Sequence, residues 1–237
     1  MKIADLCIHQ PSYWPWLGLL DKIAKSRDFI LLDNAQVSKG TYQYRNIFYC
    51  EGKAKHLTLP TRIHLGDTFN DLTFNNTNGA INHFDVLKNY YRKARYHDEI
   101  MEVIEPLYSV SYIKPIDLLI ATMRASMTIL EIDSAFYLAS SYLVEGKKGD
   151  MVLNLCKQHG ASSYLAGQGS KNYMAAYLDK FHNNGLEVLW HQFQHPIYQQ
   201  NPNEDFVVGL SCLDILFFNG IERSRQIFWD NVAKQVV

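Results

Sequence analysis

The sequence predicts an α/β fold: a Rossmann-like, mostly parallel sheet flanked by helices, with a β-hairpin and a helical insert. Two observations lead to this prediction: short apolar runs alternate with segments of helical periodicity, and several of these runs end in polar residues. The first run, residues 3–8, stops at His9-Gln10-Pro11, where proline cannot donate to a sheet ladder. Pro15 then suits the start of a helix whose apolar residues recur at helical spacing to Ile23.

Residues 28–33 form the next apolar run and the second predicted strand. Two strands that flank one helix form a β-α-β unit, which implies a parallel pair with a right-handed crossover. Asp33 is therefore expected at the same sheet edge as His9, where ligands of open α/β sheets bind. At this edge His9 could act as a general base that Asp33 orients. In the alternative interpretation His9 caps the strand and Asp33 caps the following turn.

A polar segment, residues 36–46, follows the second strand and is rich in hydrogen-bond donors. Lys39 and Arg45 could hold phosphate or carboxylate oxygens, Arg45 as a bidentate fork and Lys39 as a point charge. Gln36 and Gln43 lie in the same segment. The pattern G-x-x-x-x-G-K-[ST] is missing, so the segment is not a Walker A loop. A loop that is simply solvated is the alternative.

The remaining elements follow in order. A hairpin is predicted at residues 47–59, with 51–54 as its turn, and a largely helical pattern extends over about 80–141. A strand at 136–139, a helix at 147–159, strands at 163–166 and 186–192, and an apolar helix at 210–218 that stops at Asn219-Gly220 complete the pattern. We expect a single domain, residues 1–237, with a mainly helical subdomain at roughly 80–135.

Further candidate binding residues follow the later strands. Gly167 and Gly169 echo part of a dinucleotide-binding fingerprint, and backbone amides that enter a helix bind anions well. His195-Pro196 forms a second histidine-proline turn, rich in amides. The full set of expected substrate contacts in this half of the chain is Gly167, Gly169, Lys171, Tyr173, His195, Tyr198, Gln200 and Asp214.

Composition narrows the class of protein. Lys+Arg 23 against Asp+Glu 24 gives a net charge of -1, which argues against a nucleic-acid partner. The four cysteines are widely spaced without a C-x-x-C pair, which indicates buried thiols in a reducing compartment. No signal peptide or membrane-spanning stretch is evident, so we expect a soluble, cytoplasmic protein. The nine histidines show no H-E-x-x-H pattern, so no metal is expected.

Several ordered motifs resemble those of the WbqC-like protein family. They are His9-Gln10-Pro11 with Tyr13, Pro15-Trp16-Leu17-Gly18, Leu32-Asp33, Gln36, Lys39, Gln43, Arg45-Asn46, Leu59-Pro60, Tyr164-Leu165-Ala166-Gly167, Tyr173, His195-Pro196, Tyr198, Gln200 and Leu210-Ser211 with Asp214. Asn34 and Ala166 depart from the aspartate and serine that are common there. The resemblance implies a place in bacterial O-antigen or other surface polysaccharide biosynthesis, and transfer of acyl or aminoacyl groups onto sugars.

The predicted function is a transferase that modifies the amine or a hydroxyl of a nucleotide-linked sugar or amino sugar, with acyl-CoA or another activated acyl donor. His9 and Asp33 are the predicted catalytic pair, Lys39 and Arg45 hold phosphate or carboxylate, and the Gly167–Gly169 amides stabilise an oxyanion. Gln10, Tyr13, His195 and Gln200 line the pocket. Two alternatives stay open: a nucleotidylyltransferase-like enzyme, which the missing H-x-G-H pattern disfavours, and a noncatalytic sugar-binding or assembly protein.

Overall fold

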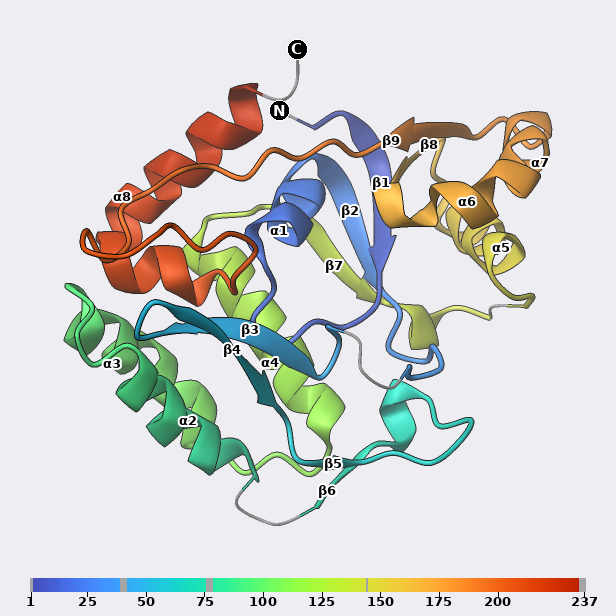
Figure 1. Cartoon of the computed structure of the whole chain (residues 1–237). Coiled ribbons are helices and arrows are strands. Elements are labelled where there is room, and N and C mark those ends of the chain that lie inside the picture. Colours follow the sequence, from blue (N-terminus) through green and yellow to red (C-terminus); the bar gives the residue numbers. More distant parts are fainter. Residues whose placement is uncertain (1, 39–41, 76–78, 144, 235–237) are drawn as a thin grey trace.

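A computed structural model describes residues 2–38, 42–75, 79–143 and 145–234 and confirms the α/β fold. Its centre is one five-stranded sheet in which all strands are parallel (Figure 1). In spatial order the strands are β7 (Ala135–Leu138), β2 (Ser26–Leu31), β1 (Ala4–His9), β8 (Ser163–Ala166) and β9 (Glu187–Trp190). The five strands predicted outside the hairpin are all present in this sheet, and their ends agree with the sequence pattern to within two residues.

The strand order places one reversal of direction in the sheet. The chain moves outward from β1 to β2 and β7, then returns to the other side of β1 for β8 and β9. In the register, His9 pairs with Leu31 and Leu31 pairs with Leu138, so the carboxyl ends of these strands are level. Ligands of such sheets bind at the reversal, outside the carboxyl ends of the strands. A ligand site is therefore expected at the edge where β1 and β8 end, which is the topological crevice of such sheets.

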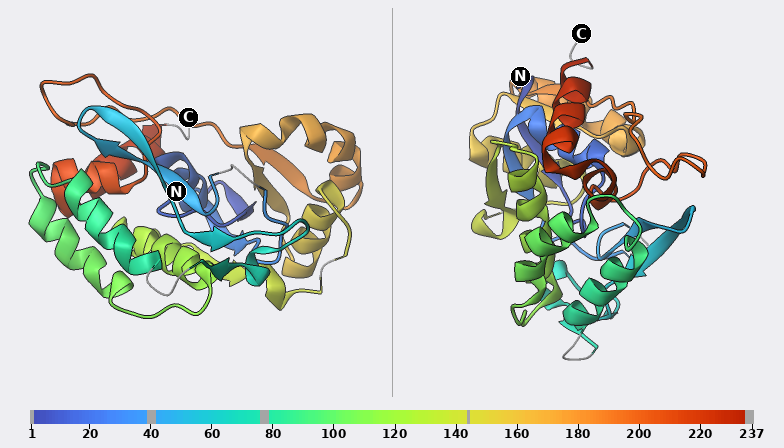
Figure 2. Two further views of the ribbon diagram at one scale, coloured as in Figure 1. Left: turned by 60° about the horizontal axis from the view of Figure 1, so that its bottom comes forward. Right: turned by 90° about the vertical axis from the view of Figure 1, so that its left-hand side faces the viewer.

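Helices cover both faces of the sheet (Figures 1 and 2). The helices α1 (Leu17–Ala24), α4 (Pro115–Ile129) and α8 (Leu213–Lys234) share one hydrophobic core with β1 residues such as Cys7. On the opposite face, α5 (Gly149–His159), α6 (Lys171–Met174) and α7 (Leu178–Asn183) form a second core with Leu6 and Ile8. Successive side chains of a strand point to opposite faces, which explains why neighbours in β1 belong to different cores.

A long excursion separates β2 from β7. It contains the hairpin β3 (Arg45–Cys50) and β4 (Lys53–Thr58), the short strands β5 (Thr61–Arg62) and β6 (Thr73–Phe74), and the helices α2 (Gly79–Tyr90) and α3 (His97–Tyr108) before α4. The hairpin turn is tighter than the predicted residues 51–54, because Glu51 and Gly52 both adopt positive φ angles of 50° and 74°. The helical insert packs onto the sheet, since its Leu87 and Ile104 belong to the core that contains Cys7.

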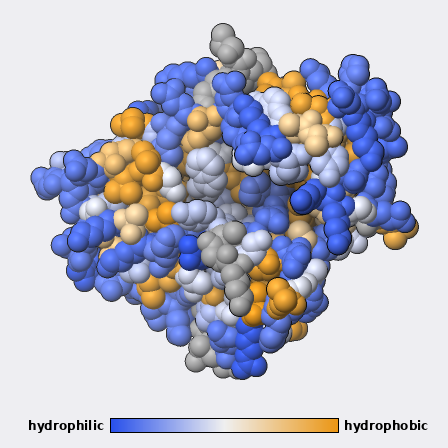
Figure 3. Space-filling model, turned by 45° about the vertical axis from the view of Figure 1, so that its right-hand side comes forward, coloured by the Kyte–Doolittle hydropathy of each residue, from blue (hydrophilic) through white to orange (hydrophobic). Residues whose placement is uncertain are grey.

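The C-terminal helix differs from its prediction. Residues 213–234 form α8, and Gly220, with φ 72° and ψ 170°, kinks the helix where the sequence predicted its end. The part beyond the kink is held by Phe228 and Val232, which are buried in the first core. Within the residues that the structure describes, no helix is long and apolar enough to cross a bilayer. The face shown in Figure 3 is largely hydrophilic, with apolar side chains in separate patches.

Candidate functional site

The loop that follows β1 is held in place by the β3 hairpin. The side-chain amide of Asn46 donates to the carbonyl oxygens of Tyr13 and Trp14 over 3.0 and 2.7 Å. The backbone amide of Tyr13 donates to the carbonyl of Gln43 over 2.9 Å. Trp14 adopts a φ of 42°, a conformation that costs energy for a residue other than glycine and persists only where surrounding contacts enforce it. The hairpin thus fixes the backbone directly beyond His9.

His9, the last residue of β1, presents a neutral imidazole with a defined tautomer. Its Nδ1 lies 2.8 Å from the carbonyl oxygen of Gln10, which can only accept, so Nδ1 carries the hydrogen. Burial, assisted by the positive charge of Lys22, lowers the pKa of His9 to about 4. At neutral pH the Nε2 atom therefore keeps a free lone pair on a half-buried ring. This is the protonation state that a general base requires.

Lys22 places a buried cation at the same crevice, and the sequence analysis missed it. Its side chain comes from α1, and its Nζ donates to the carbonyl oxygen of Ile8 over 2.9 Å. Lys22 is only 4% exposed, and no ion pair among the described residues includes it. A Cβ atom added at Gly167, just after β8, would lie 4.0 Å from Nζ. Lys22 therefore sits where β1 and β8 end.

The energetic cost of burying Lys22 makes this edge of the sheet the candidate site. Burying an ammonium without a counter-ion is unfavourable, and burial accordingly lowers the pKa of Lys22. Groups held in such environments are concentrated at catalytic and binding sites. A signal was present in the sequence, because the short helix between two buried strands contains Asp21, Lys22 and Lys25. Helical periodicity alone could not show that all three are buried.

Gln10 and Gln43, both predicted contacts, lie together beside His9. The Gln43 side-chain amide donates to Oε1 of Gln10, and its own Oε1 accepts from the backbone amide of Ser38 over 3.2 Å. Gln43 is buried and Gln10 is half-buried. This arrangement orients the remaining amide hydrogens of Gln10 while Gln43 supports it. The structure thus brings His9, Gln10 and Gln43 into one group.

Asp33 reaches the same sheet edge but does not orient His9. Its Oδ1 accepts the backbone amide of Ser140 over 2.9 Å, and its Oδ2 accepts the Asn70 side chain over 3.4 Å. Ser140 belongs to a short 3-10 turn, Ala139–Ser141, directly after β7. The carboxylate therefore caps the 3-10 turn after β7, and not the turn directly after Asp33 that the alternative interpretation predicts. The ring of His9 is held instead by the carbonyl of Gln10.

The glycines after β8 have space around them where a side chain would stand. Gly167 has an ordinary φ of -76°, and a Cβ atom at Gly169 would meet no atom within 4 Å. The predicted helix N-terminus is different: a 3-10 turn, Gln168–Ser170, leads into the four-residue α6, which is too short for a helix dipole. Lys171 lies 5.5 Å from the ring centroid of Trp190, and Tyr173 is exposed. Of this set, Gly167 is the residue that the structure places near Lys22.

Tyr13 has an internal role rather than the predicted place in the pocket wall. The indole N–H of Trp14 donates to the Tyr108 hydroxyl over 2.7 Å, and the Tyr108 and Tyr13 hydroxyls lie 2.5 Å apart. His83 Nδ1 lies 3.2 Å from the Tyr13 hydroxyl, and its Nε2 lies 3.1 Å from the Thr58 carbonyl. The Trp14 indole can only donate and the Thr58 carbonyl can only accept. These two ends therefore determine the direction of every hydrogen bond in the network. Tyr13 is fully buried, so it ties the loop after β1 to α2 and α3.

The buried His83 makes stability depend on pH. Burial lowers its pKa to about 4, below the ordinary value of 6.5, so only the unfolded chain binds a proton between these values. We expect stability to fall as the pH drops through this window, with His83 contributing about 3 kcal/mol. Urea unfolding of wild type and His83→Gln at pH 7, 5 and 4 measures the contribution. Burial raises the pKa of Asp214 to about 7, so this group stabilises the fold as the pH falls, opposite to His83. The quantity to compare is therefore the difference in unfolding free energy between variant and wild type at each pH. Parallel pH dependences would contradict the assignment.

The predicted contacts His195, Tyr198, Gln200 and Asp214 form a separate group. The Tyr198 hydroxyl and the Gln200 amide both donate to Oδ2 of Asp214, over 2.8 and 2.6 Å, and burial raises the pKa of Asp214 to about 7. His195 Nδ1 donates to the carbonyl of Pro196 over 2.8 Å. The segment after β9 passes α1, where His191 contacts Asp21, and then runs along α8 (Figure 1). These contacts therefore fasten that segment to α8. The four residues do not join the group around His9, where they were expected.

The polar segment after β2 is described only in part. Lys39 lies outside the described residues. Gln36 is exposed and forms an isolated backbone bridge with Thr68. Arg45 begins β3, its guanidinium carbon lies 6.0 Å from the ring centroid of Tyr42, and its buried Nε has no hydrogen-bond partner among the described residues. Arg45 thus retains unused capacity to bind an anion.

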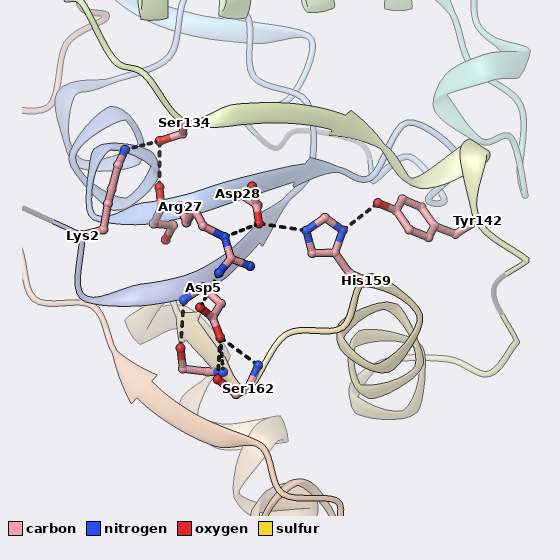
Figure 4. A network of polar contacts seen from close by, with 10 residues as sticks. Lys2, Asp5, Arg27, Asp28, Ser134, Tyr142, His159 and Ser162 are labelled. Carbon is pink, nitrogen blue, oxygen red and sulfur yellow. Dashed lines mark hydrogen bonds and ion pairs between the residues drawn. The ribbon is translucent and has the colours of Figure 1, made fainter.

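A second histidine network, shown in Figure 4, is structural. His159 Nε2 lies 3.1 Å from Oδ2 of Asp28, and its Nδ1 lies 2.7 Å from the Tyr142 hydroxyl. The arrangement has the form of a proton relay. Asp28, however, pairs with Leu6, three residues before His9 in β1. Three residues of a strand span about 10 Å, so Asp28 lies that far from the carboxyl edge of the sheet. The network therefore fastens the end of α5 to β2, away from the crevice.

Metal ligands and activated thiols are not grouped in the described part of the chain. It contains no cluster of three or more His, Cys, Asp or Glu side chains that could hold a metal ion. The four cysteines are free and buried. Burial raises the pKa of Cys7, and that of Cys156 and Cys212 to about 12, so these three thiols are poor nucleophiles at neutral pH.

Comparisons with known proteins agree with the motif pattern. An uncharacterized protein of Mycobacterium tuberculosis (strain ATCC 25618 / H37Rv) is 24% identical over 220 residues, which cover 92% of this chain and 94% of the relative. No solved structure matches the chain. A model of the WbqC-like protein family matches residues 10–226, nearly the whole length. The chain therefore belongs to the WbqC-like protein family.

Proposed function

We propose that the protein is a transferase that moves an acyl or aminoacyl group onto the amine of a nucleotide-linked amino sugar, in bacterial surface polysaccharide biosynthesis. One observation carries the proposal: a neutral imidazole with an unprotonated Nε2 and a buried ammonium without an ion pair among the described residues both lie at the reversal of a parallel sheet. Membership of the WbqC-like family supports the pathway.

The residues of the crevice can supply both needs of amine acyl transfer. The sugar amine attacks the carbonyl carbon of an activated donor such as a thioester, and a carbon–nitrogen bond forms. His9 Nε2 takes the proton that the amine nitrogen loses. The carbon–sulfur bond then breaks, and the imidazolium returns the proton to the leaving thiolate. Lys22 has two further N–H donors besides the one on Ile8, and its charge stabilises the tetrahedral oxyanion.

Other residues would bind and orient the substrates. Gln10, held by Gln43, presents amide groups next to His9 for sugar hydroxyls. Gly167 carries no side chain between Lys22 and the end of β8, which leaves room for a ligand to approach the backbone. Arg45 provides a guanidinium for the phosphates or for a carboxylate of the donor. Lys39, in the same segment of the sequence, would also bind phosphate or carboxylate oxygens.

The test is turnover of UDP-, dTDP-, GDP- and CDP-linked amino sugars with acyl-CoA donors, followed by mass spectrometry of the sugar product. We expect His9→Ala to lower kcat by about 10²- to 10⁴-fold, because it removes the general base. His182→Ala, an exposed histidine of α7, is the matched control and should keep wild-type turnover. Equal turnover in the His9 and His182 variants would contradict the proposal.

The same experiment separates the two other interpretations. A nucleotidylyltransferase-like enzyme would instead release pyrophosphate from a nucleoside triphosphate, with no acylated sugar. A noncatalytic sugar-binding protein would show binding without product, and His9→Ala would change affinity alone. A thermal-shift screen with the same nucleotide-sugars detects that binding, because a ligand of the folded state raises the apparent melting temperature.

A further inference from the structure

A hollow lies on the side of the molecule opposite the carboxyl ends of β1 and β8. It has a volume of about 480 Å³ and lies between the α2–α3 turn, β3 and residues 199–204. A neighbouring hollow of about 380 Å³ extends it toward α8. Arg95, Gln199 and Phe218 line both. Figure 1 shows the α2–α3 turn at the left edge and β8 and β9 on the right. One extended ligand can therefore occupy both hollows without reaching His9.

The charges of the two hollows are positive and spread out. Arg92, Lys93 and Arg95 line the first hollow with two carboxylates, Glu51 and Glu204, which is three cations minus two anions, or +1. The second hollow adds Arg223 and no carboxylate, which makes the total +2. The whole chain, in contrast, has a net charge of -1. The two hollows therefore carry a net positive charge, although the whole chain is slightly negative.

Three of these cations, Lys93, Arg95 and Arg223, have no carboxylate partner among the described residues. Arg92 is paired with Glu51 over 2.8 Å, whereas no ion pair in the described ranges includes Lys93 or Arg95. Arg95 is positioned by an aromatic ring, with its guanidinium carbon 5.3 Å from the centroid of Tyr96. A cation–π contact orients the guanidinium and leaves its hydrogen-bond fork available for a carboxylate. Arg95 stands where the two hollows meet.

The rest of the lining suits sugar rings. Phe218 and Tyr90 are half-buried and present aromatic surface to the first hollow. Amide side chains, Gln199, Asn201 and Asn203, supply paired donors and acceptors. Glu204 already accepts the Tyr49 hydroxyl, which holds its carboxylate at the wall. Aromatic faces with amides and carboxylates around them match the apolar faces and hydroxyl groups of a saccharide.

We infer that this double hollow binds an acidic oligosaccharide, a chain of sugars that carries carboxylate groups at intervals. Separate cations in adjoining hollows match carboxylates on successive sugars. A nucleotide fits less well, because its phosphates concentrate charge at one point and the first hollow holds two carboxylates of its own. The inference does not rest on the proposed transferase activity, since no residue of the crevice takes part.

Isothermal titration with tri-galacturonate tests the inference, with the neutral trisaccharide maltotriose and with ADP as comparison ligands. We expect tri-galacturonate to bind the full-length protein at least about 10-fold more tightly than either comparison ligand. Arg95→Ala should weaken that binding by about 10-fold or more, because it removes a bidentate carboxylate contact. Arg62→Ala, an exposed arginine of β5, is the matched control and should bind as wild type.

Three results would overturn the inference. Tri-galacturonate could fail to bind, or Arg95→Ala and Arg62→Ala could weaken its binding equally, which would indicate nonspecific attraction. Tighter binding of ADP, lost in Arg95→Ala, would identify a nucleotide site instead. His9→Ala separates this site from the crevice: it should leave tri-galacturonate binding unchanged even if the transferase proposal fails. Circular dichroism of each variant confirms that its fold is retained.

Discussion

Replacing Lys22 with methionine is expected to lower turnover by about 10²- to 10³-fold while making the folded protein more stable. Methionine has a similar unbranched shape, so it fills the same space in α1 without the charge. Turnover falls because the oxyanion loses its cation. Stability rises by about 1–3 kcal/mol, since the cost of burying an unpaired ammonium exceeds that of leaving the Ile8 carbonyl without this donor.

The prediction is specific because turnover and stability are expected to change in opposite directions. A lysine kept only to hydrogen-bond Ile8 would stabilise the fold, so its removal would lower the melting temperature and leave turnover unchanged. Kinetics with the nucleotide amino sugar and urea unfolding of the same preparation measure both quantities. Lys157→Met, at an exposed position of α5, controls for the general effect of removing one positive charge. Lower stability with wild-type turnover in Lys22→Met would contradict our assignment.

Replacing Asp21 with alanine is expected to have the largest effect on stability, a loss of about 3–5 kcal/mol. Oδ1 of Asp21 lies 2.8 Å from Lys25 Nζ and 2.6 Å from His191 Nε2, and Asp21 and Lys25 are almost completely buried. The variant leaves the ammonium of Lys25 buried without its counter-ion. The contact also joins α1 to the residue that follows β9, so its loss loosens the side of the sheet next to the crevice.

An exposed ion pair provides the matched control for Asp21. Asp150 pairs with Lys180 on the surface, and both side chains are more than a third exposed. Such pairs contribute less than about 1 kcal/mol, so Asp150→Ala should hardly change the free energy of unfolding. Chemical denaturation of both variants gives the comparison. Similar small losses in the two proteins would mean that the buried pair does not hold α1 in place.

The sequence predicted the sheet and the position of His9 well because both depend on local patterns. Apolar runs that end in polar residues define the strands, and the β-α-β rule then determines their direction. His9 follows from the proline two residues later, which ends β1. Asp33 reached the expected edge for the same reason. Its role could not be predicted, because Ser140, the partner that uses its carboxylate, lies 107 residues further along the chain.

Lys22 and the C-terminal group show what local patterns cannot give. Helix α1 lies between the sheet and α8, so it has no solvent face, and its polar residues are buried despite an amphipathic sequence. The path of residues 191–212 has no periodic pattern, and only the folded structure shows that it follows α8. Tyr198 and Gln200 were therefore expected at the crevice although they bind Asp214.

The state of the His9 ring is the most direct test of the site described here. Long-range ¹H–¹⁵N correlation spectra of histidine-labelled protein, assigned with His9→Gln, report which nitrogen carries the hydrogen and at which pH the ring is protonated. We predict a hydrogen on Nδ1, a lone pair on Nε2, a pKa of about 4, and a shift of the Nε2 signal when a nucleotide amino sugar is added. A ring that titrates near its ordinary value with its hydrogen on Nε2, and that does not respond to these sugars, would contradict a general base at this crevice.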